Sequence, residues 1–383
     1  MTSVPKRKIA LLVNLVAPSR VGVYSRLAEA FDLVILHGSM EANRMSWDRV
    51  NIKGACLHRV WGWQLRLNKH KQNRAFDHWY VHIEPGYIVG LLRERPEAVI
   101  SFEIGFRTLV ALVYGTVFGK PVWVWWGGTV HTERYVGWVR TLVRRMVAHW
   151  ASHWVSYGET STKYLLTLGI ARERILQIQN CVDDSLFSRI AAPAWEIQPK
   201  PVLLYVGRMV ACKGIANFLR AASSLQGEGV RFSIVLVGDG RDRDSLQQLV
   251  KTLRLENVRF YPAQAHEDMP AVYRSANVMI FPTMDDVWGL VANEAVLSDL
   301  PVLCSRYAGC APELFDRDCI FDPGSEEEFV IALRRAVAGQ LPRADQTRLK
   351  RSCEVGDMIA EAVEASLAGA RPKSRDGAAT ASV

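Results

Sequence analysis

The sequence predicts an α/β protein of two domains, each built around a parallel β-sheet. The chain has 383 residues, which is enough for two domains of ordinary size. Short continuous apolar runs alternate with segments of helical period in both halves, as expected for parallel strands buried on both faces. We predict domains at residues 1–185 and 200–367, with a linker of mixed polarity at 186–199. The small, polar residues 368–383 predict a disordered tail.

Composition narrows the class of protein. The apolar fraction of 49% excludes a disordered or fibrous chain. The sequence has no uninterrupted apolar run of about 18 residues, so we expect no membrane-spanning helix. The basic N-terminus precedes only the short apolar run Ile9–Val16, which predicts a first strand and not a signal peptide. The seven cysteines are scattered without a CxxC pair, which predicts reduced thiols, no zinc site and a cytoplasmic location.

The net charge of +8 is unevenly placed. Residues 1–185 hold 24 Lys and Arg against 14 Asp and Glu, and they also hold ten of the twelve tryptophans. This bias indicates either a surface for anions, including a membrane face where Trp is favoured, or a charge imbalance that only aids solubility. No recognised nucleic-acid-binding module accompanies the charge, so we expect no nucleic-acid partner.

The first half predicts one open sheet. Its predicted strands span residues 9–16, 33–36, 98–102, 121–126, 154–157 and 175–178. The first turn lacks a GxGxxG sequence, so we exclude a nicotinamide-dependent enzyme. Residues 37–80 are polar and aromatic, with a basic run from Arg66 to Arg74, and predict a long functional loop with short helices.

The segment 138–150 has an apolar stripe of helical period with arginines on its other side. The stripe comprises Trp138, Val139, Leu142, Val143, Met146, Val147 and Trp150, and the arginines are Arg140, Arg144 and Arg145. We favour a helix that packs the stripe on its own sheet and leaves the arginines in solvent. The alternative is a basic amphipathic helix that lies on a membrane surface.

The second half repeats the alternation of strands and helices. Its predicted strands span residues 202–206, 233–237, 258–261 and 278–281, and a further apolar run begins at Pro301. Open α/β sheets bind ligands at the carboxyl ends of their strands. The loops that follow these strands therefore hold the candidate functional residues.

Two cations follow the first strand of this half. Arg208 and Lys213 lie in a glycine-flanked loop that opens a helix. Together with the helix N-terminus they would form a site for a doubly charged group such as a diphosphate. Surface cations near a turn are also common without a ligand, so this pair alone leaves both interpretations open.

Carboxylates follow the fourth strand. Asp285 and Asp286 lie in its loop, and Glu294 lies eight residues after Asp286. Carboxylates are strong hydrogen-bond acceptors for sugar hydroxyls, and Gly289 permits close approach of the backbone. The alternative is a helix N-terminus that the acids merely stabilise.

A histidine, two glutamates and two Asp-x-Asp triplets are further candidates. His131 follows Gly127-Gly128 at a strand end, which favours a site residue over a structural histidine, and Glu133 and Glu159 are weaker candidates. Asp-x-Asp triplets at 242–244 and 316–318 are of a kind that holds a divalent metal on a diphosphate. Each has Arg in the middle and no partner acid in view, so we interpret them as solvated loop charges. A metal-dependent transferase that uses Asp242 and Asp244 is the alternative.

Together these segments resemble the retaining nucleotide-sugar glycosyltransferases of family 4, the glycosyl transferases group 1 type with the GT-B fold. The resemblance covers roughly residues 200–340 and is looser before them. Its motifs are Tyr-Val-Gly-Arg-x4-Lys-Gly at 205–214, Val-Gly-Asp-Gly at 237–240, Val-x-Phe at 258–260, Ala-Asn-Val-Met-Ile-Phe-Pro-Thr at 276–283, Trp-Gly-Leu-Val-Ala-Asn-Glu-Ala at 288–295, Leu-Pro-Val-Leu-Cys-Ser at 300–305 and Gly-Cys-Ala-Pro-Glu-Leu at 309–314. Gly-Gly-Thr-Val-His at 127–131 and Asn-Cys-Val-Asp at 180–183 extend it.

The resemblance implies two Rossmann-like domains that face each other across a cleft. It implies transfer of a sugar from a nucleoside diphosphate donor with retention of configuration, and no metal or other cofactor. Arg208 and Lys213 would bind the donor diphosphate, and Glu294 would bind the ribose. Asp286 would lie by the donor sugar, which His131 would orient. The further donor-binding positions that it implies are Gly22, Gly207, Gly240, Val258, Gly289 and Leu290.

Two positions depart from the family pattern. Asp286 stands where Glu is usual, and its side chain is one methylene shorter. Relatives often have paired glycines in the first loop, where this chain has Ser19-Arg20-Val21-Gly22; Gly22 is carried over, and Arg20 is a further candidate. Because of Asp286, a GT-B-like module that binds a nucleotide sugar or an anionic glycan without turnover is the alternative function.

The first domain is expected to bind the acceptor. Because it is basic and rich in Trp, we hypothesise a glycan or lipid-diphosphate-linked glycan acceptor in envelope or exopolysaccharide synthesis. Peripheral contact with the inner face of the plasma membrane would follow.

Overall fold

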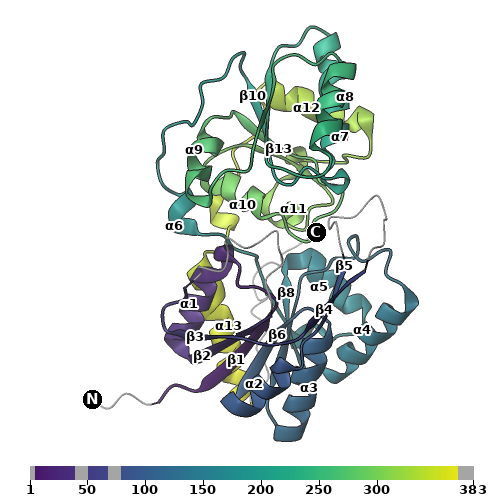
Figure 1. The fold of residues 1–383 in the computed structure, drawn as a ribbon. Coiled ribbons are helices and arrows are strands. Elements are labelled where there is room, and N and C mark those ends of the chain that lie inside the picture. Colours follow the sequence, from purple (N-terminus) through teal and green to yellow (C-terminus); the bar gives the residue numbers. More distant parts are fainter. Residues whose placement is uncertain (1–4, 39–50, 68–78, 370–383) are drawn as a thin grey trace, which may run out of the picture. The chain divides into compact units, whose positions relative to one another are not determined.

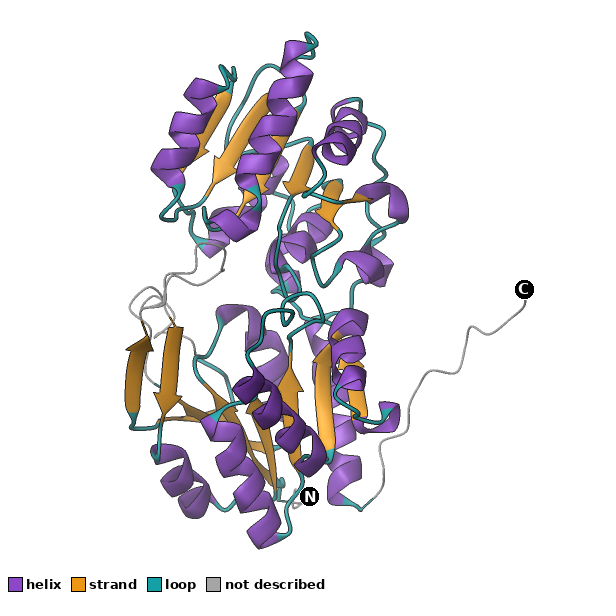
Figure 2. Cartoon of the chain, turned by 90° about the vertical axis from the view of Figure 1, so that its right-hand side faces the viewer, coloured by secondary structure: helices purple, strands orange, loops and turns teal. Residues whose placement is uncertain are grey.

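The computed structural model divides into two compact units (Figure 1). It describes all residues except 1–4, 39–50, 68–78 and 370–383. Of the described residues, the first unit comprises those up to Leu67, 80–179 and 351–369, and the second comprises Trp79 and 180–350. Each unit is an open parallel β-sheet with helices on both faces (Figures 1 and 2). The predicted α/β class with two Rossmann-like domains is confirmed.

The sheet of the first unit has seven strands in the order β3-β2-β1-β6-β7-β8-β9. These are β1 (Lys8–Val13), β2 (Asp32–His37), β3 (Ala55–Arg59), β6 (Ala98–Phe102), β7 (Val122–Trp126), β8 (His153–Tyr157) and β9 (Ile175–Ile178), all paired in parallel. Every residue of β6 and β7 is buried, which explains why these strands are apolar apart from Ser101. A separate two-stranded sheet contains β4 (Trp63–Leu67) and β5 (Trp79–Ile83).

Helices cover both faces of this sheet. On one face, α2 (Gly86–Glu94), α3 (Phe106–Phe118), α4 (Trp138–Trp150) and α5 (Gly158–Thr167) share one buried core with the strands. On the other, α1 (Val21–Ala30) and α13 (Ser352–Leu367) lie side by side (Figure 1). The side chain of Trp123 lies on that second face, where its Nε1 donates to Ser366 Oγ at 3.1 Å.

The position of α13 corrects the predicted domain boundary. The sequence predicts a second domain that runs to residue 367, whereas α13 packs on α1 in the first unit. Arg26 Nε donates to Asp357 Oδ1 at 2.6 Å, and a Cβ on Gly356 would lie 2.6 Å from Arg26 Cβ. An amphipathic period shows that a helix buries one face but does not show which sheet receives it. The predictions for residues 39–50, 68–78 and the tail beyond Gly369 lie outside the described residues.

The favoured interpretation of α4 is wrong for most of its apolar stripe. Trp138 is 79% exposed and Leu142 is 61% exposed, whereas Val143 and Val147 pack on the core of the sheet as predicted. Two of the three arginines are exposed, also as predicted. Arg144 is buried instead, paired with Glu133, and its Nη1 donates to Tyr164 Oη at 2.8 Å. The protein supplies a carboxylate and a hydroxyl for this guanidinium, so its burial leaves no unpaired charge.

The second unit has six parallel strands in the order β12-β11-β10-β13-β14-β15. These are β10 (Val202–Val206), β11 (Ser233–Val237), β12 (Val258–Tyr261), β13 (Val278–Phe281), β14 (Val302–Ser305) and β15 (Ile320–Phe321). Its helices are α6 (Asp184–Phe187), α7 (Ile215–Gly227), α8 (Arg243–Thr252), α9 (Met269–Arg274), α10 (Leu290–Leu297), α11 (Ala311–Leu314) and α12 (Glu326–Val337). Within the described residues, no helix combines the length and apolar character needed to cross a membrane.

Candidate functional site

The strand order places a topological switch point between β10 and β13. These strands are neighbours in register, with Leu203 beside Val278 and Leu204 beside Met279. From this pair the sheet grows outward in both directions, through β11 on one side and β14 on the other. Ligands of open α/β sheets bind where the chain leaves the carboxyl ends of such strands. The loops after β10 and β13 are therefore the primary candidates, and they hold most of the residues that the sequence singles out.

A backbone hydrogen bond connects the loop after β10 to the loop after β13. Met284 N donates to Cys212 O at 2.7 Å, which is a backbone hydrogen bond between the loops. Gly214 has a φ of +68°, and a Cβ at this position would collide with the carbonyl oxygen of Pro282. Only glycine tolerates both conditions, so the sequence Lys213-Gly214 is required for the loops to meet.

The structure brings Lys213 and Asp286 together. Lys213 Nζ lies 2.5 Å from Asp286 Oδ2, and the two side chains are only 13% and 19% exposed. The other carboxylate oxygen, Oδ1, accepts a hydrogen bond from Trp288 N at 3.3 Å. The cation and the acid that were predicted for different parts of a ligand therefore form one ion pair at the switch point. Arg208, on the same loop as Lys213, is exposed.

Glu294 lies in α10, one helical turn after the loop of Asp286. Its Oε2 accepts a hydrogen bond from Tyr273 Oη at 2.6 Å. Burial raises the pKa of Glu294 to about 7, against the lowering effect of the Tyr273 hydrogen bond. The residue as a whole is partly exposed. The pKa is raised because protein atoms surround the carboxyl group and reduce its contact with water. Its carboxyl group is thus part-protonated near neutral pH.

The start of α10 is fixed by glycine and by a buried tryptophan. Gly289 has a φ of +102°, and a Cβ there would collide with the ring of Phe281. The adjacent Trp288 is fully buried, and its Nε1 donates to Asn293 Oδ1 at 2.8 Å. Asn293 Nδ2 in turn donates to Asn180 O at 2.9 Å. The phrase Asn180-Cys181-Val182-Asp183, predicted to close the first domain, therefore belongs to the second unit.

Three more of the donor-binding positions that the resemblance implies lie in this unit. Gly207 and Gly240 follow β10 and β11 at the same edge, where Met209 N donates to Asp239 O at 2.8 Å. Leu290 is the first residue of α10 and is part-exposed. These three lie on the same sheet edge as Lys213.

Val258 does not join them. It is the first residue of β12 and lies beside Ile234, whereas the carboxyl ends of the two strands meet where Val237 lies beside Tyr261. Three residues of strand separate Val258 from that edge, which is roughly 10 Å at the usual rise. The implied donor-binding role of Val258 is therefore not supported by its place in the strand.

The first unit holds the remaining candidates. His131 lies in the turn after β7, part-exposed, and its carbonyl accepts a hydrogen bond from Arg134 N at 3.4 Å. Glu133 is committed to its ion pair with Arg144, which gives it a structural role. Glu159 pairs with Lys163 at 2.6 Å on α5, one turn away on the same helix. Of these residues, His131 stays a candidate for ligand contact.

The predicted first loop is mostly helical. Gly22 lies in the first turn of α1, where a Cβ would lie 2.5 Å from Ser352 Oγ of α13. This contact explains the glycine by helix packing, and ligand binding by Gly22 stays a prediction. Arg20 lies just before α1, with its guanidinium 4.4 Å from the centre of the Phe102 ring and 5.6 Å from that of Tyr157.

The sequence analysis missed a polar cluster at the switch point of the first sheet. Asn14 and Glu103 directly follow the neighbouring strands β1 and β6, and both contact Arg107, which is buried. Glu103 has a φ of +63°, which is unusual for a residue with a side chain, and its side chain is 67% exposed. Strained backbone of this kind is frequent at ligand sites. The signal in the sequence was a polar residue immediately after each of two buried strands.

Aspartates of the two Asp-x-Asp triplets lie beside arginines. Asp316 pairs with Arg348 at 2.8 Å, and Asp318 with Arg335 at 3.7 Å. Asp242 lies 3.6 Å from Arg241 at the start of α8. Over the part of the chain that the structure describes, no three His, Cys, Asp or Glu side chains come together as a metal site.

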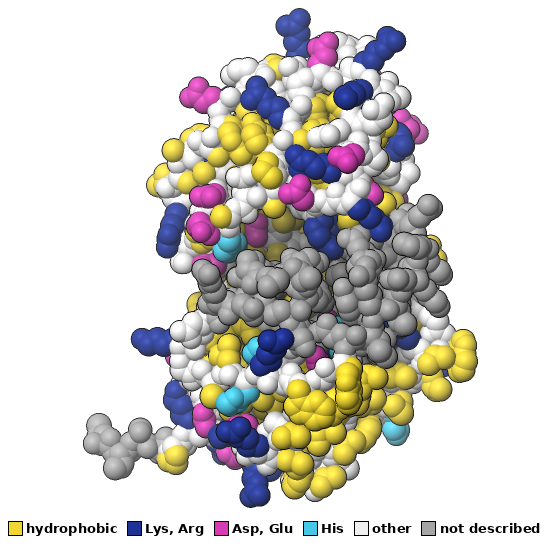
Figure 3. Space-filling model, viewed as in Figure 1, with side chains coloured by type: hydrophobic (Ala, Val, Ile, Leu, Met, Phe, Trp, Pro, Cys, Tyr) yellow, Lys and Arg dark blue, Asp and Glu magenta, His cyan; other side chains and the backbone are white. Residues whose placement is uncertain are grey.

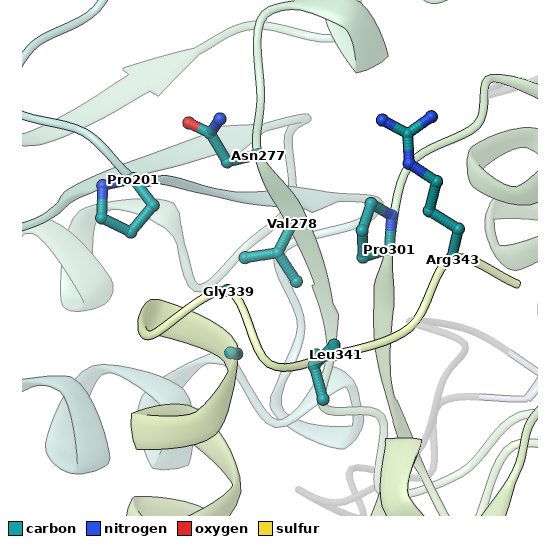
Figure 4. A pocket seen from close by; sticks show the side chains of 8 residues that line it. Pro201, Asn277, Val278, Pro301, Gly339, Leu341 and Arg343 are labelled. Atoms are coloured by element: carbon teal, nitrogen blue, oxygen red, sulfur yellow. The ribbon is translucent and has the colours of Figure 1, made fainter.

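A pocket in the second unit lies at the wrong edge for this site. Its lining includes Pro201, Asn277 and Pro301, each of which immediately precedes a strand (Figure 4). Leu341 and Arg343 from the segment after α12 complete it. The pocket is therefore at the amino ends of the strands, and none of the candidate residues lines it.

The part of the chain that holds this site matches a known protein family. Residues 190–352 match the family model described as glycosyl transferases group 1. The matched range contains the switch point of the second sheet and every candidate residue of the second unit. It covers less than half of the chain.

Two curated relatives match only part of the chain, at 25% and 28% identity. A 2-deoxystreptamine glucosyltransferase from Streptomyces kanamyceticus is 25% identical over 292 residues, which are 69% of this chain and 74% of that protein. The sulfoquinovosyl transferase SQD2 from Arabidopsis thaliana is 28% identical over 141 residues, 35% of this chain. The match spans only 26% of the length of that plant protein.

A solved structure extends the likeness to nearly the whole fold. The crystal structure of HepE from Anabaena in complex with UDP and glucose superposes with a TM-score of 0.63 at 15% identity. The superposition covers 95% of this chain and 98% of that protein. At this identity the likeness shows the fold, and it confirms the GT-B class that the sequence resemblance implied.

Proposed function

We propose that the protein is a glycosyltransferase that moves a sugar from a nucleoside diphosphate donor to a glycan or lipid-linked glycan with retention of configuration. The observation that carries the proposal is the ion pair of Lys213 and Asp286 at the switch point of the second sheet. It lies within the residues that match glycosyl transferases group 1. Some structural neighbours bind UDP and sugar, as HepE does.

The proposed leaving group is a nucleoside diphosphate, and this loop supplies positive charge for it. Lys213 and Arg208 precede α7, whose N-terminus has neither a capping side chain nor an acid in its first turn. The first turn of α10 likewise contains no acid. Preorganised cations and free helix N–H groups stabilise the negative charge that grows on a departing diphosphate.

Asp286 has two tasks in this proposal. In the structure it neutralises Lys213, so the cation is held in place before a donor arrives. When the diphosphate takes over the pairing with Lys213, the carboxylate becomes an acceptor for the hydroxyls of the donor sugar. The shorter side chain of Asp is compatible with the short distance to Lys213.

The transfer itself needs no protein nucleophile. The transition state would resemble an oxocarbenium ion beside the departing diphosphate, and the acceptor hydroxyl would attack the same face while the leaving phosphate takes its proton. Glu294 would hold the ribose. His131 would orient the donor sugar, as the resemblance implies, and a fall in kcat in His131→Ala without loss of donor binding would support this role.

We propose that the first unit binds the acceptor. Support comes from the cluster of Asn14, Glu103 and Arg107 at the carboxyl edge of its sheet, where open α/β sheets bind ligands. The exposed Glu103 carboxylate is suited to hydroxyl groups of a glycan. A cytoplasmic location agrees with the seven cysteines, all of which are in the described residues and form no disulfide.

The proposal also includes independence from divalent metal. Support comes from Asp242, Asp316 and Asp318, each of which lies beside an arginine. Turnover should therefore be unchanged by a chelator. Loss of activity with chelator and recovery with Mg²⁺ or Mn²⁺ would favour the metal-dependent alternative.

The test of the proposal is release of nucleoside diphosphate from a panel of UDP- and GDP-sugars with candidate acceptors. We expect release with at least one donor, and nuclear magnetic resonance of the product should show the anomeric configuration of the donor. A second candidate function, a binding protein without turnover, is favoured by the shortened acid Asp286. Tight donor binding without release from any donor and acceptor would support that function and contradict the transferase.

A further inference from the structure

The outer side of the layer formed by α2, α3 and α4 is apolar. Eleven large apolar side chains on these helices are between 38% and 79% exposed. They are Ile88, Val89 and Leu92 on α2, Val113, Val117 and Phe118 on α3, and Trp138, Val139, Leu142, Met146 and Trp150 on α4. We call this set the apolar helix face.

The apolar helix face is continuous. The three helices share one buried core on the same side of the sheet. Trp150 Nε1 of α4 donates to Thr116 Oγ1 of α3 at 2.9 Å, which joins the two helices at their outer side. Figure 3 shows apolar side chains gathered on the first unit over α2 and α3 and reaching toward α4.

The size of this face is unusual for a surface that stays in water. Eleven side chains of this kind, about half exposed, present on the order of 1,000 Å² of apolar surface, whereas monomers rarely expose more than a few hundred Å² in one patch. In the described part of the second unit only Ile190, Val287 and Ile331 are exposed to a comparable degree. Most of the exposed large apolar side chains of the described residues thus lie on α2, α3 and α4; the others of the first unit are Trp61, Trp63, Val130, Tyr135 and Leu166.

The exposed charges on these helices are positive, and the one acid, Glu94 at the end of α2, is largely shielded between Lys8 and Arg93. Neither α3 nor α4 contains an acidic residue, whereas Arg140 and Arg145 of α4 are exposed. Arg93 of α2 is 76% exposed. The acid on α2, Glu94, is only 13% exposed and lies 3.2 Å from Lys8 Nζ. An apolar face bordered by arginines is complementary to a surface that is apolar inside and negatively charged at its boundary.

We propose that the apolar helix face docks the protein peripherally on an anionic lipid bilayer. The apolar side chains would enter the headgroup region, with Trp138 and Trp150 at opposite ends of α4 in the interfacial layer that Trp favours. The arginines would contact lipid phosphates. A second copy of this chain is a poorer occupant, because a symmetric interface would gather both sets of arginines, and neither α3 nor α4 offers an acid to pair with them. The proposal stands whether or not the protein turns over a donor.

The test uses the full chain and vesicles of two compositions, phosphatidylcholine alone and phosphatidylcholine with an equal amount of phosphatidylglycerol. We expect co-sedimentation with the anionic vesicles, weaker binding to the neutral ones, and loss of binding at about 0.5 M salt, since screening weakens the contacts of arginine with phosphate. The variant Val117→Glu with Leu142→Glu should bind anionic vesicles about ten-fold more weakly or worse, because two carboxylates replace apolar anchors. Both positions are more than 60% exposed, so the fold should be retained.

The control is Ile331→Glu, which introduces one carboxylate at a position that is 56% exposed on α12 of the second unit. It should bind vesicles like the unchanged protein. The variant Arg145→Glu should bind anionic vesicles more weakly and neutral vesicles equally well. Absence of binding to anionic vesicles, or equal loss of binding in Ile331→Glu, would overturn the proposal. A dimer in sedimentation velocity that the Val117→Glu with Leu142→Glu variant dissociates would overturn it in favour of a second copy.

Discussion

At the scale of single residues, the site depends on charges that are paired before a ligand arrives. Lys213 and Asp286 are largely shielded from water, so each would pay a desolvation cost if the other were absent. Glu294 shows the opposite case, because among the described residues no cation pairs with it and burial raises its pKa to about 7. The first arrangement prepares a cation for a diphosphate, and the second keeps a carboxyl group that can both donate and accept hydrogen bonds near neutral pH.

The role proposed for Lys213 predicts a specific loss of activity. Lys213→Ala should lower kcat/KM for the donor about 100-fold or more, as expected when one preorganised donor to a developing anion is removed. Arg208→Ala should raise the donor KM and lower kcat as well. Steady-state kinetics with the best donor would measure both effects. Arg220→Ala, an exposed arginine on α7, is the control and should behave like the unchanged protein; normal kinetics in Lys213→Ala would remove it from the site.

Glu294 predicts a pH dependence of stability. Its pKa is higher in the folded than in the unfolded protein, so the folded state binds the extra proton between about pH 4.5 and pH 7. The free energy of unfolding should therefore fall as the pH rises through this window, by about 3 kcal/mol from this group. In Glu294→Gln this part of the slope should disappear. Urea unfolding at pH 5 and pH 8 would measure it, with Glu327→Gln as a control for the loss of one charge at an exposed position; identical slopes in Glu294→Gln and the unchanged protein would refute the assignment.

At the scale of elements, the loops after β10 and β13 are held in one arrangement by backbone contacts. The loop after β10 must turn through a left-handed residue at Gly214, with the carbonyl of Pro282 against it. These backbone contacts fix the arrangement of the two loops. The loops in turn position the side chains of Lys213 and Asp286.

Alanine substitutions at two glycines distinguish the close contact between the loops from the cost of a positive φ alone. Gly214→Ala should lower the free energy of unfolding by more than about 2 kcal/mol and weaken nucleotide binding, because the loops must move apart. Gly339→Ala is the matched control, since Gly339 also has a positive φ, +70°, but no atom lies near the position of a Cβ. It should lose only the conformational penalty of about 1–2 kcal/mol. Equal losses in the two variants, with unchanged nucleotide binding, would contradict the structural account of the loop.

At the scale of the whole molecule, the chain returns to its first unit after completing the second. Helix α13 buries Ile359 and Val363 against the first unit, so stability of that unit depends on residues more than 170 positions after its last strand. Mutations near the C-terminus should therefore act on the first unit.

Ile359→Ala should destabilise the first unit by about 2–5 kcal/mol, as expected for a fully buried Ile. Hydrogen exchange read by mass spectrometry should show lost protection in β1, β2 and α1, with β10, β11 and β13 unchanged. Ile331→Ala, at an exposed position on α12, is the control. Loss of protection confined to the second unit would mean that α13 belongs there.

The sequence predicted the fold class and most of the second unit, because unbroken apolar runs and glycine loops are local signals. It did not predict the partner of α13 or the outward stripe of α4. The period of α4 was visible, but the burial of Arg144 depends on Glu133 and Tyr164, which only the folded chain brings together. Glu103 was missed because its sequence signal is only a polar residue directly after a buried strand, and its left-handed backbone is seen only in the folded chain. The donor-binding role of Val258 stays a prediction, because a motif does not show which end of a strand carries the ligand contacts.

The central claim is that a nucleoside diphosphate sugar binds at the switch point between β10 and β13. A crystal structure after soaking with UDP- and GDP-sugars tests it most directly. The account predicts a diphosphate within hydrogen-bond distance of Lys213 Nζ and Arg208, a ribose at Glu294 and a sugar beside Asp286. A nucleotide bound elsewhere, or none at saturating concentration while Lys213 stays paired with Asp286, would contradict it.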